Sequence, residues 1–351
     1  MKSGILVFRL TLLASIAQLS GGCFDLKESA PSLIELRGNA LATTWTVKLL
    51  TTKSVNMQDV KKAIEQRLEA NEKIFSHWRK DALLYQFNKT KHTEPIVVDS
   101  RIYKLLKHAN WMHQNSAGAF DPAIGHLVNI WGFGPDGKNR SSIPPEEQIE
   151  KARQTSGMNQ LKILPEKMVR KNHPTLQLDL SGSAKGEIID QICQLLDRHS
   201  FGNYLVEIGG EIRAEGKGRK GNGWVVGLED GLSKNENGMT SVPLRNYAVA
   251  TSGSYRLTKP NPGSNRNASH LIDPRTGRPI EHDLIAVNAF APTARDADAW
   301  ATALMILGPE DGMKIAEKMD MVARFCVSRE DGVLILKSTA YDRIFTKLPT
   351  N

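Results

Sequence analysis

An aspartate and a threonine four residues apart have the chemistry to hold a divalent cation. Asp298 and Thr302 lie in the alanine-rich stretch Ala294–Leu304, and their spacing puts both side chains on one face of a helix. The alanines keep that face shallow, so a ligand can approach closely. A carboxylate and a hydroxyl are hard oxygen donors, suited to Mg²⁺ that shares its ligands with phosphate and water. The alternative interpretation is a core helix with a polar edge.

A second candidate is the stretch Leu176–Asp190. Its apolar residues alternate up to Leu180, small residues follow at Ser181-Gly182-Ser183, and the apolar spacing then becomes helical. The pattern predicts a strand, a turn and a helix start, where backbone N–H groups and the helix dipole favour a phosphate. Lys185 adds a positive charge. The sequence lacks G-x-x-x-x-G-K-[ST], so this is no Walker A loop, and a plain strand-to-helix connection is the alternative.

A histidine at the start of a tight turn is a candidate general base. His270 opens the segment His270–Pro279, in which Asp-Pro-x-x-Gly predicts a turn. A histidine at a loop rim near arginines can accept a proton at neutral pH. In the alternative reading the segment is only a hairpin loop, with Asp273 capping its own backbone.

The elements that must position these residues follow from the apolar spacing. Helices and strands interleave irregularly without a repeat, which predicts one mixed α+β domain over residues 34–351. Helices are expected at about 58–75, 100–116, 144–157, 294–307 and 310–318. Strands are expected at 34–50 (as a pair), 161–164, 168–171, 176–180, 204–214, 224–228, 247–250 and 285–290, with a final hairpin of 324–328 and 333–336.

Residues 1–22 are typical of a secretory leader, with Lys2 and Arg9 followed by an apolar run from Leu10 to Leu19. Residues 23–33 then form an anchor and linker, because small residues before Cys23 resemble a bacterial lipoprotein signal, in which that cysteine is lipidated. Ser20 stands where a large aliphatic residue is usual, so secretion with a free Cys23 is the alternative. We expect an exported protein held at the bacterial cell membrane, facing the periplasm or the outside.

Composition narrows the class of partner. The chain has 351 residues and a formal net charge of +8, and removing the two basic residues of the leader leaves +6. This charge suits a polyanionic small molecule or an acidic membrane surface. The basic residues are scattered and no recognised binding motif occurs, which argues against nucleic acid. Cys193 and Cys326 lie in apolar contexts and are expected to be buried thiols, not a disulfide or a metal site.

Six motifs in order resemble the ApbE family, the bacterial FAD:protein FMN transferases. The resemblance covers roughly residues 36–340, nearly the whole chain after the leader. It rests on SAGAFDPAIG with LVNIWGFG (116–134), LDLSGSAKG (178–186), VEIGGEIR (206–213), TSGSYR (251–256), SHLIDPRTGRPI (269–280) and ADAWATALMILG (297–308).

The resemblance implies a Mg²⁺-dependent reaction in which FAD is cleaved at its pyrophosphate. FMN is joined through its phosphate to a threonine hydroxyl of a target protein, and AMP is released. Targets in the family are exported or membrane redox proteins with a Ser/Thr-Gly-Ala-Thr type of acceptor sequence. Catalysis of such a phosphoryl transfer is mostly positioning and charge neutralisation.

The resemblance also implies a role for individual residues. The metal ligands would be the Ala184 backbone carbonyl, Asp298 and Thr302, and His270 would deprotonate the acceptor threonine. The flavin nucleotide would contact Leu41, Trp78, Ala119, Phe120, Asp121, Asp179, Lys185, Glu187 and Leu271.

Three positions depart from the family pattern. The usual Met-Gly-Thr is Leu41-Ala42-Thr43, Trp78 replaces another stacking residue, and Glu187 stands where tyrosine is common. Glu187 either hydrogen-bonds the adenosine portion or only caps the helix. The departures bear on the fit of FAD, not on the reaction class.

Three other functions compete with transfer. The same site could hydrolyse FAD to FMN and AMP with water as the acceptor, or the protein could be a non-catalytic FAD-binding lipoprotein. Asp298, Thr302 and His270 argue against the second. An unrelated solute-binding lipoprotein would need a two-lobed pattern of strand–helix units, which the sequence does not show.

Overall fold

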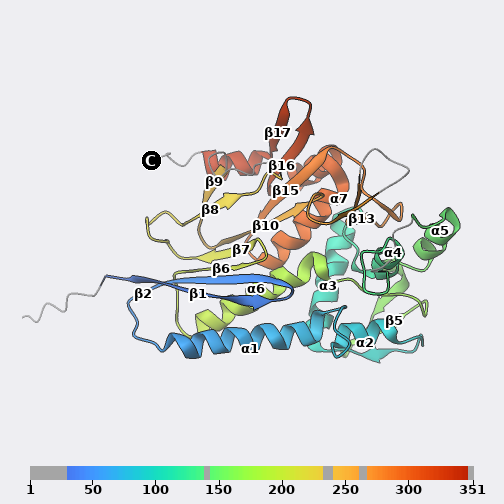
Figure 1. The fold of residues 1–351 in the computed structure, drawn as a ribbon, viewed down its shortest axis with the longest axis horizontal. Helices are drawn as coiled ribbons and strands as arrows, with labels where there is room; N and C mark the ends of the chain where they lie inside the picture. Colours follow the sequence, from blue (N-terminus) through green and yellow to red (C-terminus); the bar gives the residue numbers. More distant parts are fainter. Residues whose placement is uncertain (1–29, 138–142, 232–239, 261–266, 347–351) are drawn as a thin grey trace, which may run out of the picture.

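An eight-stranded antiparallel sheet forms the centre of the computed structural model (Figure 1). The structure describes residues 30–137, 143–231, 240–260 and 267–346. The mixture of sheet and helices confirms the predicted α+β class. In sheet order the strands are β1 Ser32–Ala40, β2 Thr43–Thr51, β6 Tyr204–Ile208, β7 Glu211–Glu215, β10 Tyr247–Gly253, β15 Leu284–Ala291, β16 Val322–Arg329 and β17 Gly332–Lys337.

The sheet is covered on both faces, so its central strands are apolar on both sides. Every residue of β15 is buried. Along β10, Ala248 and Ala250 face the main core with helices α6 (Ser181–Arg198) and α7 (Ala294–Lys318). Val249, between them, joins a second core with the hairpin of β8 (Trp224–Leu228) and β9 (Thr240–Leu244) and the short helix α8 (Thr339–Tyr341). The alternation along each strand thus divides the interior into two layers.

Further helices and small sheets complete the fold, and of these α1 (Met57–Phe75) and α3 (Ser100–Asn115) pack against α6 (Figure 1). Helix α1 buries the predicted stripe of Val60, Ile64, Leu68 and Phe75. The other helices are α2 Leu83–Lys89, α4 Gly125–Ile130 and α5 Glu146–Gln154. The small sheets contain β3 Ile96–Val97, β5 Met168–Lys171 and β4 Leu161–Ile163, then β11 Thr258–Lys259 with β12 Ala268–Ser269, and β13 Ile272–Asp273 with β14 Arg278–Pro279.

The expected strand at 176–180 is wrong, and so is the turn expected at 181–183. Residues 176–180 form no strand, and α6 begins directly at Ser181. Leu178 is held by the side chain of Asn88, which donates to its carbonyl and accepts from its N–H, each at 2.8 Å. Asp179 N–H donates to the Pro122 carbonyl at 2.7 Å. The leucines therefore alternate because one side of this extended segment is buried, although no strand pairs with it.

The single strand expected at 204–214 is also wrong. Gly209 and Gly210, both with positive φ, turn the chain so that β6 and β7 form a hairpin. The two predicted helices at 294–307 and 310–318 are confirmed as the two parts of α7, which is kinked between them at the non-helical Gly308. Helices α2 and α4 and strand β9 were not predicted. The pairs β1–β2 and β16–β17 are confirmed.

Helices α6 and α7 approach closely because glycine lies at the contact. A Cβ on Gly186 would lie 2.2 Å from the Ala294 carbonyl oxygen and 2.6 Å from the Arg295 Cα. One turn earlier, a Cβ on Gly182 would lie 3.2 Å from the Thr302 side chain. Only hydrogen at Gly186 permits this spacing, while Gly182 leaves little room for a side chain. The first turn of α6 is thereby brought against the face of α7 that carries Asp298 and Thr302.

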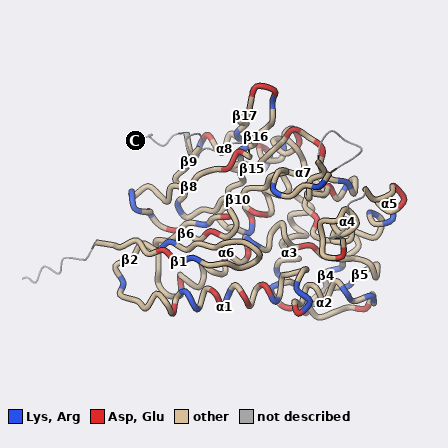
Figure 2. Tube along the Cα trace, in the orientation of Figure 1, with Lys and Arg blue, Asp and Glu red and all other residues tan. Residues whose placement is uncertain are grey.

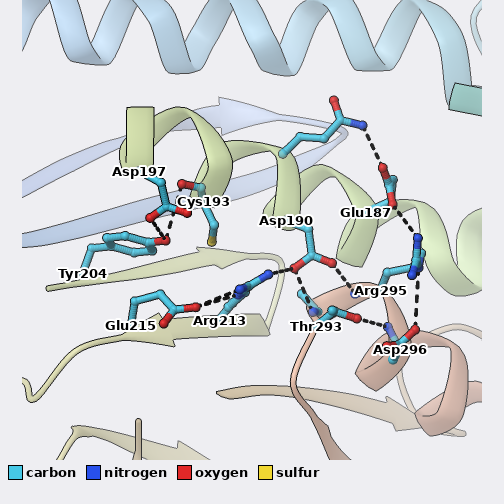
Figure 3. Close-up of polar contacts among 12 residues, drawn as sticks. Glu187, Asp190, Cys193, Asp197, Tyr204, Arg213, Glu215, Thr293, Arg295 and Asp296 are labelled. Atoms are coloured by element: carbon cyan, nitrogen blue, oxygen red, sulfur yellow. Dashed lines mark hydrogen bonds and ion pairs between the residues drawn. The ribbon is translucent and has the colours of Figure 1, made fainter. Parts of the chain in front are cut away.

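A buried carboxylate fixes the start of α7 (Figure 3). Asp190, in the middle of α6, accepts hydrogen bonds from the N–H groups of Ala294 at 2.9 Å and Arg295 at 3.0 Å. These N–H groups have no partner within a helix, and the negative charge also complements the helix dipole. Arg213 of β7 donates to the same carboxylate at 2.6 Å. One side chain therefore joins α6, α7 and the sheet.

The remaining sequence predictions concern the thiols, the charge and the termini. Cys193 and Cys326 are free and buried, as predicted. Basic and acidic residues are interspersed over the fold in Figure 2. The leader and Cys23 lie outside the described residues. Within the described residues, no helix has the length and hydropathy needed to cross a membrane.

The helix contact predicts the effect of a single methyl group. Gly186→Ala should destabilise the protein by about 1–3 kcal/mol, because the methyl group meets backbone that cannot move independently. Urea unfolding of the full chain measures this. Gly202→Ala is the control, since nothing lies within 4 Å of a Cβ there. Equal stability of the two variants would contradict a close helix contact.

Candidate active site

A pocket of about 310 Å³ opens between the start of α6, the face of α7 and the end of β10. It is lined by residues from distant parts of the sequence. Nine of the predicted site residues are among them, namely Trp78, Phe120, Asp121, Asp179, Lys185, His270, Leu271, Asp298 and Thr302. The fold therefore brings the metal, phosphate and base candidates to one place.

Four predicted residues lie outside this lining. Ala184 precedes Lys185 in the first turn of α6, and Ala119 is buried next to Phe120. Leu41 is in the turn between β1 and β2, where its φ is 55°. The role predicted for each of the three stays a prediction.

Glu187, the fourth, is engaged by other residues (Figure 3). It accepts from Gln191 at 3.0 Å and lies 3.5 Å from Arg295. Burial raises the pKa of this carboxyl, while Gln191 and Arg295 oppose the rise. Its predicted contact with the nucleotide remains a prediction, since Glu187 is not in the pocket lining.

The predicted phosphate site and the predicted metal face meet at two buried carboxylates. Asp298 is 4% exposed and accepts from Gly186 N–H at 3.0 Å. Glu211 is 2% exposed and accepts from Lys185 Nζ at 2.7 Å, with Arg256 Nη1 at 4.0 Å. Burial, and then the charge of Glu211, raise the pKa of Asp298 to about 7, while Lys185 lowers it. Such shifts are frequent where a site binds a cation or handles protons.

The predicted base has the correct ring nitrogen available. His270 Nδ1 lies 3.1 Å from the carbonyl oxygen of Leu257, and a carbonyl can only accept. Nδ1 therefore carries the proton, and Nε2 keeps a lone pair. Burial lowers the pKa of His270, opposed by Asp179 and assisted by Arg256 and Lys185. The neutral imidazole, which is the form that accepts a proton, is thus favoured at pH 7.

Asp179 and Trp78 also line the pocket. Asp179 accepts from Ser181 N–H at 2.9 Å and is 3.7 Å from His77 Nδ1. Burial tends to raise the pKa of Asp179, but His77 and Ser181 outweigh it, so that the pKa is lower than usual. Trp78 beside it is 46% exposed. An exposed indole at a pocket mouth offers a stacking surface for a planar ring.

Asp121 lines the pocket and also holds the neighbouring backbone in place. Its two oxygens accept from the N–H groups of Ala123 at 2.8 Å and Met158 at 2.9 Å. Both bonds hold the loop that presents Phe120. Asp121 is therefore engaged by backbone, and it positions the wall of the pocket.

Sequence reasoning missed His77, Glu211, Ser252 and Arg256 as site residues. Ser252 Oγ lies 3.4 Å from Thr302 Oγ1. Glu211 and Arg256 stand in two of the six motifs, VEIGGEIR and TSGSYR. Both are charged residues close behind a glycine, Glu211 after Gly210 and Arg256 after Gly253, and this position was the available signal. Spacing alone did not show which charged side chains point into the pocket.

Comparison with known proteins identifies the family. The ApbE family model matches residues 41–325. The FAD:protein FMN transferase of Escherichia coli (strain K12) is 31% identical over 307 residues, covering 87% of this chain and 86% of that protein. The FAD:protein FMN transferase of Haemophilus influenzae is 33% identical over 319 residues, covering 89% and 91%.

Solved structures agree with the sequence relatives. Flavin transferase ApbE from Vibrio cholerae superposes with a TM-score of 0.80 at 31% identity, covering 89% of this chain and 99% of that one. The flavinyl transferase ApbE from Pseudomonas stutzeri, in its apo form, gives a TM-score of 0.82 at 31% identity, covering 90% and 97%. The chain therefore belongs to the ApbE family of flavin transferases.

Proposed function

We propose that this protein transfers FMN from FAD to a threonine hydroxyl of a target protein in a Mg²⁺-dependent reaction that releases AMP. The observation that carries the proposal is the pocket in which Asp298, Thr302, Lys185 and His270 line one space. A bond forms between the threonine Oγ and the FMN phosphorus, and the bond from that phosphorus to the bridging oxygen breaks. AMP leaves with the bridging oxygen, and the hydroxyl proton passes to His270 Nε2.

The residues present fit a magnesium ion. Gly186 N–H engages only Oδ2 of Asp298, which orients the carboxylate and leaves the other oxygen for a ligand. Thr302 adds a hydroxyl, and the Ala184 carbonyl has a second lone pair beyond any helix bond. In the described residues no three His, Cys, Asp or Glu gather as a metal site, so the fit rests on this mixed set of hard oxygens. A bound cation would neutralise pyrophosphate charge.

The other walls suit the two halves of FAD. Lys185 and Arg256 supply positive charge, and the start of α6 supplies the positive end of a helix dipole. Trp78, Phe120 and Leu271 offer aromatic and apolar surface for a flavin ring. The site would hold the pyrophosphate between the charged wall and the metal face, with His270 toward the entering hydroxyl.

The proposal includes export and a membrane anchor. The apolar leader and the small residues before Cys23 support lipidation of that cysteine. The target would be an exported or membrane redox protein with a Ser/Thr-Gly-Ala-Thr type of acceptor sequence. The intact mass of the mature protein tests the anchor, because an unmodified Cys23 would exclude it.

Incubation of the purified protein with FAD, Mg²⁺ and an acceptor domain tests the reaction. Intact-mass spectrometry should show the acceptor gain one FMN, with an equal amount of AMP released. AMP without modified acceptor would instead establish hydrolysis of FAD by water. Tight FAD binding without either product would establish a carrier.

Removal of the aspartate tests the metal face. Asp298→Ala should lower transfer by about 10²-fold or more, because charge stabilisation at the reacting phosphate is lost. The fold should persist, since the change removes a buried carboxylate whose burial is unfavourable. Asp311→Ala, at an exposed position of the same helix, is the matched control. Unchanged activity of Asp298→Ala would exclude the residue as a ligand.

The pH dependence tests the base. His270 accepts a proton only when neutral, which requires a pH above its pKa, and burial moves that pKa below 6.5. Transfer should therefore rise with pH on the acidic side and become constant before neutrality. His270→Ala should lower the plateau by about 10²–10⁴-fold and remove the acidic limb. His92→Ala, at an exposed position, should keep both, and an unaltered limb in His270→Ala would assign it to another group.

A further inference from the structure

Glu211 carries an unsatisfied oxygen at the edge of the proposed reaction site. It begins β7, directly after the glycine turn, and lines the pocket although only 2% of its surface is exposed. Oε1 is engaged by Lys185 at 2.7 Å. Oε2 is fully buried and has no hydrogen-bond partner. Leaving a buried acceptor unpaired destabilises the protein, more so when the group is charged, so its retention calls for a ligand group.

The chemistry of that group is restricted. Burial raises the pKa of Glu211, and the ammonium of Lys185 opposes this rise. As the carboxylate partner of that ammonium at 2.7 Å, Glu211 only accepts hydrogen bonds or binds cations. The missing partner must therefore be a cation or an N–H or O–H donor. The phosphates of a nucleotide are acceptors and do not qualify.

The surrounding charges favour a donor that is itself bound to the metal. Lys185 has three N–H donors, so it can hold Glu211 and still donate to a pyrophosphate. Glu211 accepts from Lys185 and Asp298 accepts from the adjacent Gly186, so the two carboxylates line the same pocket beside consecutive residues of α6. Mg²⁺ usually keeps several of its waters, and these waters are strong donors. A metal beside Asp298 would thus present water to a neighbouring carboxylate.

We propose that Glu211 is a positioning residue of the metal site, whose Oε2 accepts a hydrogen bond from a metal-bound water while Oε1 holds Lys185 toward the pyrophosphate. This inference rests on the proposed function. Carboxylates that orient a metal's ligands in this way typically change metal affinity by 10–100-fold. Glu211 would also link the two sources of positive charge, the metal and Lys185.

The test measures metal binding by the full protein with FAD, using Mn²⁺ as a spectroscopic substitute for Mg²⁺. Glu211→Gln keeps the size of the side chain and an oxygen for Lys185 but removes the charge. Electron paramagnetic resonance titration should show Mn²⁺ affinity reduced by about tenfold or more. FAD affinity without metal, measured by flavin fluorescence, and the melting temperature should stay close to the wild-type values.

A second variant separates a direct effect from one through the lysine. Glu211→Gln leaves the ammonium of Lys185 without its counter-charge, and the positive charge of Lys185 could then repel the metal. In Glu211→Gln with Lys185→Met, the affinity should remain about tenfold below that of Lys185→Met alone. Equal affinities in these two proteins would overturn the proposal, because Glu211 would then only neutralise Lys185.

FAD binding without metal, and Mn²⁺ binding by the wild-type protein, also test the role of Glu211. If Glu211→Gln weakens FAD binding without metal but leaves Mn²⁺ affinity unchanged, Glu211 acts on the nucleotide and not on the metal, and the inference is overturned. If Glu211→Gln does not fold, Glu211→Asp serves instead, since it keeps the charge but shortens the reach, and unaltered Mn²⁺ affinity there would count against the inference. A wild-type protein that binds no Mn²⁺ with FAD would contradict the metal in the proposed function, whereas equal binding by wild type and Glu211→Gln would contradict this inference alone.

Discussion

The close contact between α6 and α7 is the constraint on which the site depends. The absence of a side chain at Gly186 allows the first turn of α6 to reach the backbone of α7. Asp190 then fixes the start of α7 through two N–H groups and binds Arg213 of the sheet. Asp298 closes the contact by accepting from Gly186 N–H. The same contact places the first turn of α6, with Ala184 and Lys185, against the face of α7 that carries Asp298 and Thr302, so packing and the arrangement of the candidate site have one cause.

The site concentrates groups that are unfavourable for stability. Asp298 and Glu211 are buried carboxylates. Asp298 accepts a hydrogen bond from Gly186 N–H, and Glu211 is paired with Lys185 through only one of its two oxygens. Burying ionised groups disfavours the folded state unless they are paired. A bound cation with its waters would supply the missing partners. The arrangement is therefore explained by ligand binding and not by the needs of the core, where apolar residues of similar size would be more stable.

Sequence patterns predicted the helices and strands correctly where burial of one face or a turn residue alone determined the local structure. The stripe in α1 and the pairs β1–β2 and β16–β17 followed from burial on one face and from turn residues. They failed at 176–180, where alternating leucines are buried but the backbone bonds go to Asn88 and Pro122. They failed again at 204–214, where Gly209 and Gly210 reverse the chain. Alternation reports which side of an extended chain is buried, and does not report whether another strand lies beside it.

The sequence by itself determined the mixed α+β class, the family resemblance, and the chemical types of the candidate residues. It did so because periodic burial, glycine turns and motif order are local properties of the chain. Only the tertiary structure decided which charges meet. Lys185 and Glu211 are 26 positions apart and Gly186 and Asp298 are 112 apart, yet each pair is hydrogen-bonded. Their contact depends on how α6, β7 and α7 pack around the central sheet, which no local spacing encodes.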